Sequence, residues 1–136
     1  MRNTFRKSER LNGKKALEEV YRHGRVVKCY PFIARYKPAD QEESSPVRLA
    51  ISVPKRKVKR AVNRNRIKRH VREAYRIRKH ELYDLLQSAN QHWHVLLIFV
   101  GSADVSQKIV NEKISSILAR FCEEVVNKHE TDEDKK

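Results

Sequence analysis

A stretch of the chain, residues 55–79 (KRKVKRAVNRNRIKRHVREAYRIRK), constrains the fold more than any other segment. Thirteen of its residues are Lys or Arg, and Glu73 is its only acid. Like charges at this density repel one another unless a polyanion supplies the opposite charge. The fold must therefore hold this segment at the surface, where it can meet an anionic partner.

The same stretch keeps a helical period of apolar residues. At about 100° per residue, Ile67, Val71 and Ala74 fall on one side of a helical wheel, with Tyr75 and Leu82 beside them. The opposite side is nearly all cationic and carries Asn65, Lys68, Arg69, Arg72, Arg76 and Lys79. The pattern predicts an amphipathic helix with one packed face and one basic face.

The segments before the basic helix predict a helix and two strands. A helix is expected from an N-cap at Asn12 to Gly24, which suits a left-handed C-cap position. The β-branched and aromatic residues 26–36, interrupted by Pro31, predict one strand that lies at an edge or begins near the proline. Residues 48–53 alternate in polarity and predict a second strand. We expect the two strands to pair as a hairpin across a long loop.

The segments after the basic helix predict a central strand and a long helix. The near-continuous apolar run 93–100 is typical of a strand buried on both faces, hence of an interior position in the sheet. Apolar residues at helical spacing predict a helix over 105–126. Residues 1–128 are expected to form a single domain, and the charged residues 129–136 a disordered tail. The element order indicates a small α/β sandwich.

Charge and composition favour a cytoplasmic protein. The net charge is +14, and residues 1–80 hold 25 Lys/Arg against 7 Asp/Glu. No apolar segment follows the basic N-terminus as a signal peptide would require, and the longest apolar run is far shorter than the roughly 20 residues of a membrane span. Cys29 and Cys122 are isolated thiols, which we interpret as reduced and packed. We expect no membrane partner.

Catalysis by the protein's own side chains has little support in the sequence. A protein nuclease needs clustered carboxylates for metal ions, or a histidine pair with a basic partner. The acids of the basic half are scattered, and His92 and His94 could place two metal ligands on one strand face without a third nearby. We therefore expect no catalytic residue and no metal ligand in this chain.

Four aromatic residues near the first helix and strand allow two interpretations. They could pack in the core, or they could line a groove in which single-stranded bases stack beside cations. The residues are Tyr21, Tyr30, Phe32 and Tyr36.

The basic segment and the strand before it, LAISVPKRKVKRAVN followed by RNRIKRHVREAY, closely resemble the signature of the bacterial ribonuclease P protein subunit. The matching positions include Arg64-Asn65-Arg66, Lys68-Arg69 and Tyr75. The likeness extends upstream, where F-x-K-S-E-R-L corresponds to residues 5–11 and an aromatic-x-x-Gly ending of the first helix corresponds to residues 21–24.

This resemblance implies an α+β fold of order αβββαβα around a small central sheet, with a left-handed βαβ crossover through the basic helix. It implies the protein subunit of a ribonucleoprotein endoribonuclease that removes the 5′ leader of precursor tRNA. Hydrolysis is then carried out by the catalytic RNA, which also binds most of the Mg²⁺. The implied partners are that RNA and precursor tRNA, and no obligate protein partner is evident.

The resemblance also assigns site residues by position. The surface named after the RNR motif, and expected to bind RNA, comprises Arg60, Arg64, Asn65, Arg66, Lys68, Arg69 and Arg72. A cleft between the first helix and the sheet, expected to bind the leader, comprises Leu17, Tyr21, Arg35, Lys55 and Arg56. Leu17 stands where many members have Phe, whereas Tyr21 keeps the ring of another common Phe.

Three other functions fit the sequence less well than this assignment. A general RNA-binding or ribosome-associated protein without processing activity would explain the charge, but it gives no reason for the R-N-R-x-K-R pattern. A DNA-binding basic zipper would need apolar residues every seven positions after the basic region, and that register breaks after Leu82. A self-sufficient protein nuclease would need the missing carboxylate cluster.

Overall fold

The computed structural model describes residues 7–39 and 45–134, with side chains up to residue 125. Its elements run in the order η1, α1, β1, β2, β3, α2, β4, α3. Apart from the short 3-10 helix η1, this is the αβββαβα order that the resemblance implies. The bounds are η1 Lys7–Glu9, α1 Lys14–His23, β1 Arg25–Cys29, β2 Phe32–Pro38, β3 Val47–Ser52, α2 Ala61–Ser88, β4 Trp93–Phe99 and α3 Gln107–Asp134.

Four strands form one mixed sheet in the order β1-β2-β4-β3. The pairs β1–β2 and β2–β4 are antiparallel, whereas β3 and β4 are parallel. The apolar run 93–100 therefore forms an interior strand, as its pattern predicts. The α+β fold class is confirmed, while the left-handed sense of the crossover from β3 through α2 to β4 stays a prediction.

The expected hairpin between residues 26–36 and 48–53 is wrong. Residues 26–36 contain two strands, β1 and β2, which pair with each other across a two-residue turn at Tyr30 and the cis residue Pro31. β4 lies between β2 and β3. Alternation of polarity marks a strand but does not specify its neighbour, so a later strand could enter the sheet unseen. Part of the intervening loop, residues 40–44, lies outside the described residues.

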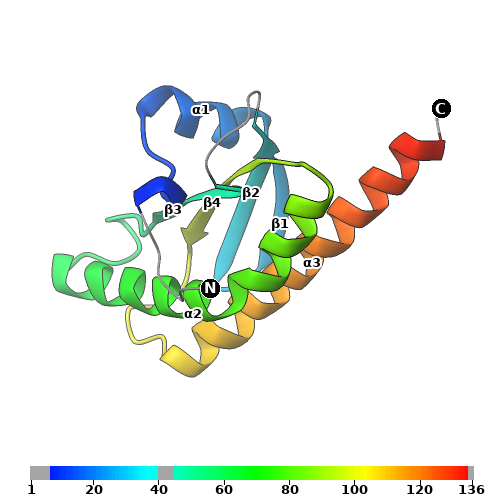
Figure 1. Ribbon diagram of the computed structural model, residues 1–136. Helices are drawn as coiled ribbons and strands as arrows, with labels where there is room; N and C mark the ends of the chain where they lie inside the picture. Colours follow the sequence, from blue (N-terminus) through cyan, green and yellow to red (C-terminus); the bar gives the residue numbers. More distant parts are fainter. Residues whose placement is uncertain (1–6, 40–44, 135–136) are drawn as a thin grey trace.

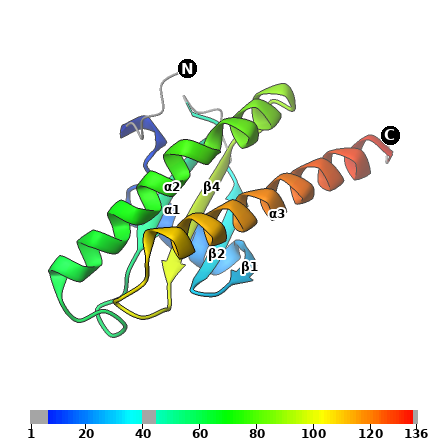
Figure 2. The same ribbon diagram turned by 90° about the horizontal axis from the view of Figure 1, so that it is seen from below.

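Helices cover both faces of the sheet (Figures 1 and 2). α2 and α3 pack on one face over the main core, to which β4 contributes Trp93, Val95, Leu97 and Phe99. α1 packs on the other face over a small cluster of Leu11, Val20 and Leu96. Since both faces of β4 meet apolar side chains, its sequence shows no polar alternation.

The N-cap of the first helix lies one residue later than expected, and the C-cap lies at Gly24 as expected but in another conformation. The residue before α1 is Gly13 with φ 96°, one position after the expected Asn12. Gly24 follows the helix with extended backbone (φ −74°, ψ 152°) and is not left-handed. A Cβ at Gly24 would lie 2.4 Å from the Val20 carbonyl oxygen and 3.2 Å from the Tyr36 nitrogen. Glycine is required there by close approach of the backbone to β2.

α3 continues past the expected end at residue 126 and runs to Asp134. Figure 1 shows its last turns extending beyond the body of the molecule. Part of the expected disordered tail, residues 129–134, is therefore helical. The division of the chain into a domain and a tail at residue 128 stays a prediction.

Candidate nucleic-acid interface

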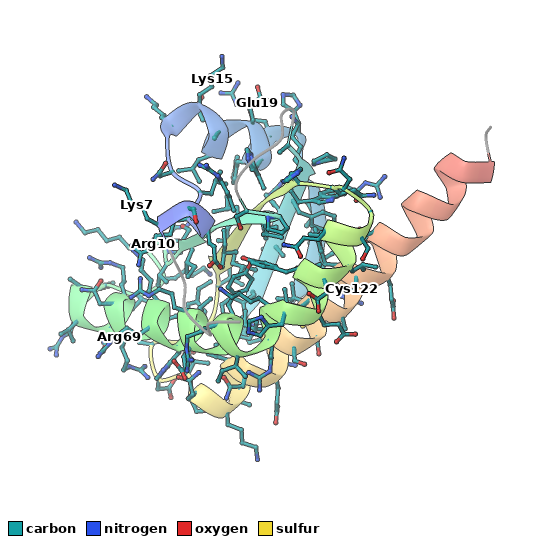
Figure 3. All side chains as sticks on the ribbon, viewed as in Figure 1. Lys7, Arg10, Lys15, Glu19, Arg69 and Cys122 are labelled. Atoms are coloured by element: carbon teal, nitrogen blue, oxygen red, sulfur yellow. The ribbon has the colours of Figure 1, made fainter. Side chains whose placement is uncertain are left out.

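The cations of the basic segment gather along the outer side of α2 and the loop before it. Exposed positions include Lys55, Arg56, Arg60, Asn65 and Arg69, and Lys68 and Arg72 are partly exposed. Figure 3 shows Arg69 on the outer side of α2. Ile67 and Val71, in contrast, are fully buried. The helix therefore has the two faces that its sequence predicts.

Two arginines of this surface are engaged by the fold itself. Arg64 Nη1 donates to the carbonyl oxygens of Val58 (3.0 Å) and Lys59 (2.8 Å). These carbonyls belong to the loop that leads into α2, so the side chain fixes the path of the chain at the start of the helix. Arg60, the residue before α2, makes no side-chain capping hydrogen bond among the described residues.

Arg66 joins α2 to the loop between β4 and α3. Its Nη1 donates to the Val105 carbonyl (3.0 Å), and its Nη2 donates to the Ala103 carbonyl. Nη1 also contacts His70 Nε2 at 3.0 Å, which must accept because a guanidinium has no acceptor. A second hydrogen bond also joins α2 to this part of the chain: Gln107 Nε2 donates to the His70 carbonyl at 2.9 Å.

These contacts argue against one expectation from the sequence. The helical wheel places Arg64 and Arg66 off the apolar face, and from that position alone an alanine at either site is expected to leave the fold intact. Both instead hold loop carbonyls, and those of Ala103 and Val105 are remote in sequence. A wheel shows only the helix itself, so it cannot reveal a loop that returns to the helix from elsewhere.

Arg66→Ala is expected to lower the free energy of unfolding by roughly 1.5–3 kcal/mol, because hydrogen bonds from a charged donor are lost. Arg66→Lys should recover only part of the loss, since an ammonium cannot reproduce the planar fork. Urea unfolding of the purified variants measures the effect. Arg69→Ala is the matched control and should change stability by no more than about 0.5 kcal/mol. Equal midpoints for both alanine variants would contradict the structural role of Arg66.

One cation of the predicted basic face is buried. Lys79 is 3% exposed and its Nζ lies 2.5 Å from Glu9 Oε2, which also accepts from the Tyr83 hydroxyl at 2.8 Å. The Tyr83 and Tyr75 hydroxyls are 2.9 Å apart. Burial raises the pKa of Tyr83. Burial, together with the neighbouring Tyr83 hydroxyl, raises the pKa of Tyr75 well above its usual value. Both phenols are thus neutral around pH 7.

The sequence gives a weak indication of the Glu9–Lys79 pair, which helical periodicity alone does not provide. Glu9 is the first acid of the chain and belongs to the K-S-E-R-L segment, which the structure places against β3 through a hydrogen bond from Leu11 N to the Leu49 carbonyl (2.9 Å). An acid in a strongly basic segment is a natural partner for a buried cation. Phe5, the other marked residue of that segment, lies outside the described residues.

The predicted cleft residues on α1 and β2 do come together. Arg35 Nη1 donates to the Tyr21 carbonyl at 3.0 Å, and its guanidinium carbon lies 4.7 Å from the centre of the Tyr21 ring. Tyr21 is nevertheless 55% exposed. Leu17 is half-buried and packs against the small cluster under α1. The Nε of Arg35 is buried and has no hydrogen-bond partner among the described residues.

Lys55 and Arg56, the other two predicted cleft residues, lie on neither α1 nor β2. They follow β3, which is separated from β2 by β4. Both are exposed. Residues 55 and 56 therefore belong to the beginning of the basic segment as much as to the cleft, and their assignment to the leader stays a prediction.

The four aromatic residues divide between the two interpretations. Phe32 and Tyr36 are in the core, where Phe32 contacts Phe99 and Tyr36 contacts Phe121 edge to face. Tyr21 and Tyr30 are exposed by 55% and 68%. Sequence alone could not separate them, because all four lie in or next to short elements with similar neighbours.

The described residues show neither a metal-binding group nor a membrane-spanning helix. Among the side chains of residues 7–39 and 45–125, no three His, Cys, Asp or Glu residues form a group that could hold a metal ion. His92 Nδ1 lies 3.3 Å from the Ser45 carbonyl. None of the described helices combines the length and apolar character that a membrane span requires.

The chain is similar to known proteins over most of its length. The profile of the family described as Ribonuclease P matches residues 5–122. The ribonuclease P protein component of Porphyromonas gingivalis strain ATCC 33277 is 32% identical over 115 residues, which cover 85% of this chain and 84% of the relative. That of Chlorobaculum tepidum is 39% identical over 83 residues, covering 59% and 54%.

Solved structures with a similar fold belong to proteins of the same description. The RNase P protein of Staphylococcus aureus aligns with a TM-score of 0.66 at 20% identity, covering 85% of this chain and 96% of that one. The RNase P protein from Thermotoga maritima aligns with a TM-score of 0.61 at 21% identity, covering 82% and 96%. These two likenesses concern the fold, whereas the family profile and the relatives in sequence concern descent. The chain belongs to the ribonuclease P protein family.

Proposed function

We propose that this chain is the protein subunit of ribonuclease P, which binds the catalytic RNA and the 5′ leader of precursor tRNA in the cytoplasm. The observation that carries the proposal is the one-sided cationic surface of α2, in a chain that belongs to this family. The RNA performs the hydrolysis and binds the Mg²⁺. The protein neutralises phosphates that would otherwise repel one another.

The contacts on α2 divide this surface into two groups. Arg64 and Arg66 already donate to loop carbonyls and hold the helix in place. Asn65 and Arg69 are exposed, Lys68 and Arg72 are partly exposed, and these four face RNA. Asn65 adds a neutral donor and acceptor, which charge neutralisation alone does not require. It is suited to a ribose hydroxyl or a base edge.

The cleft supplies a different kind of contact. Tyr21 presents an exposed ring on which a base of the leader stacks. The guanidinium of Arg35 lies over that ring and is fixed by the Tyr21 carbonyl, so the two side chains act as one preformed unit. The unpartnered Arg35 Nε is the kind of group that a bound ligand or water satisfies.

Adding the purified protein to ribonuclease P RNA should raise the cleavage rate of precursor tRNA most at low Mg²⁺. The physical reason is that protein cations replace part of the counter-charge that Mg²⁺ supplies. Gel assays of 5′-leader release across a Mg²⁺ series measure this, with protein alone and RNA alone as controls. Rates with and without protein that agree at every Mg²⁺ concentration would reject the proposal. They would favour a general RNA-binding or ribosome-associated protein instead.

Tyr21→Ala should weaken binding of precursor tRNA to the assembled enzyme by about 5- to 150-fold, the effect of losing one stacked base. Mature tRNA, which lacks the leader, should bind the variant and the unaltered enzyme equally. Tyr21→Phe keeps the ring and is the matched control. A Tyr21→Ala variant that weakens both tRNAs to the same extent would disprove the cleft assignment.

A further inference from the structure

A groove of about 740 Å³ lies between the β1–β2 turn and α3. Its walls are the turn residues Tyr30 and Pro31 on one side and α3 on the other. Figure 2 shows β1 and β2 next to α3 at this place. α1, the helix that includes Tyr21, packs on the opposite face of the sheet (Figure 1). The groove is therefore distinct from the leader cleft.

The α3 wall is a single stripe of the helix. Ile109, Lys113, Ser116 and Arg120 are spaced by four, three and four residues, which places them on one side of α3. The neighbouring stripe of Val110, Ile114, Ile117 and Phe121 is buried in the main core. α3 thus has one stripe for the core and an adjacent one that lines the groove.

The groove combines an exposed aromatic ring with cations. Tyr30 is 68% exposed and Ile109 is 38% exposed, so both offer apolar surface to a ligand. Arg120 Nη1 donates to the Lys28 carbonyl at 3.0 Å, which ties this guanidinium to the end of β1. Lys113 lies on the same helix stripe, and Asp104 is the one acid among the residues that line the groove. An aromatic platform beside cations is the arrangement that binds single-stranded nucleic acid.

The groove also adjoins the basic surface of α2. Val105 lines the groove, and its carbonyl accepts from Arg66 of α2. The loop that carries Val105 therefore separates the two regions by the width of one chain segment. An RNA that lies along α2 can cross this loop and enter the groove.

We propose that the groove is a second RNA site, in which one single-stranded nucleotide stacks its base on Tyr30 and sets its phosphate against Lys113 and Arg120. The groove proposal rests on the proposed function only for which RNA reaches the groove. Net positive charge along the lining favours an anionic ligand over a neutral or basic protein segment. The exposed Tyr30 ring favours RNA over an acidic peptide, because every base has a face that can stack on it.

Photocrosslinking of the full chain to a uridine dodecamer that contains 4-thiouridine tests the site. Mass spectrometry of the crosslinked peptides should find Tyr30 among the crosslinked residues, with a yield that saturates as the RNA concentration rises. Lys113→Glu should raise the half-saturating RNA concentration at Tyr30 by roughly tenfold, because a phosphate contact becomes a repulsion. Lys15→Glu makes the same charge change on the far face of the molecule, on α1, and should leave the half-saturating concentration unchanged.

The outcomes separate this site from the proposed function. Absence of crosslinks at Tyr30, or an equal shift in both glutamate variants, would overturn the groove site while leaving the cleavage assay unaffected. Saturable crosslinks at Tyr30 in a protein that fails to assist ribonuclease P RNA would support the groove and reject the function. The variant Tyr30→Ser could instead lose self-association in sedimentation while it binds RNA as the unaltered protein does. That result would overturn the proposal and assign the groove to a second protein copy.

Discussion

Affinity for ribonuclease P RNA is expected to fall by about 10³- to 10⁵-fold as salt rises from 50 to 200 mM, if the protein makes roughly 6–10 phosphate contacts. The cause is release of counterions from the RNA, which is less favourable at high salt. Filter binding or fluorescence anisotropy across a salt series measures the slope of log Kd against log salt.

Arg69→Ala should reduce that slope by about one unit, because one phosphate contact is lost. Lys15→Ala removes an equal charge from the outer side of α1, where Figure 3 places this side chain, and should leave the slope unchanged. A slope near zero for the unaltered protein would show that binding does not depend on the cationic surface. An equal fall for both variants would show that net charge matters and position does not.

Lys79→Met should lower the free energy of unfolding by roughly 3–5 kcal/mol, the usual result of leaving one member of a buried ion pair without its partner. Glu9 would then keep a carboxylate at a site that is only 7% exposed. The melting temperature should fall by about 10 °C or more. Differential scanning calorimetry measures both quantities.

The double variant Glu9→Gln with Lys79→Met removes both charges and should regain most of the lost stability. Lys68→Met, on the partly exposed side of the same helix, is the single-site control and should stay within about 0.5 kcal/mol. A loss of less than about 1 kcal/mol in Lys79→Met would mean that water compensates the carboxylate. In that case the pair contributes little to the fold.

The sequence predicts where the helices and strands of this fold lie better than it predicts which strands pair with each other. The unbroken run 93–100 specifies an interior strand, because only a strand covered on both faces dispenses with polar residues. Nothing in residues 48–53 shows that this strand pairs in parallel with a later one, since pairing depends on where α2 returns the chain. The turn at Tyr30-Pro31 likewise divides what reads as one strand.

The candidate site shows the same limit at the level of side chains. Helical periodicity places Asn65 and Arg69 at the surface, and the structure agrees. It also places Lys79 at the surface, where the structure instead shows a buried partner of Glu9, because η1 covers that part of α2. Which cation binds a ligand and which binds the fold depends on distant segments, and a local pattern carries no information about them.

The hydrogen bonds from Arg66 to the Ala103–Val105 loop have a consequence for genetics. They make the backbone of that loop part of what positions α2, although none of its residues carries a positive charge. Under the proposed function, a mutation that displaces the loop would thus appear in a screen as a defect in RNA processing, although every cation of α2 is unchanged. Variation at positions 103–105 is accordingly to be interpreted together with variation at Arg66.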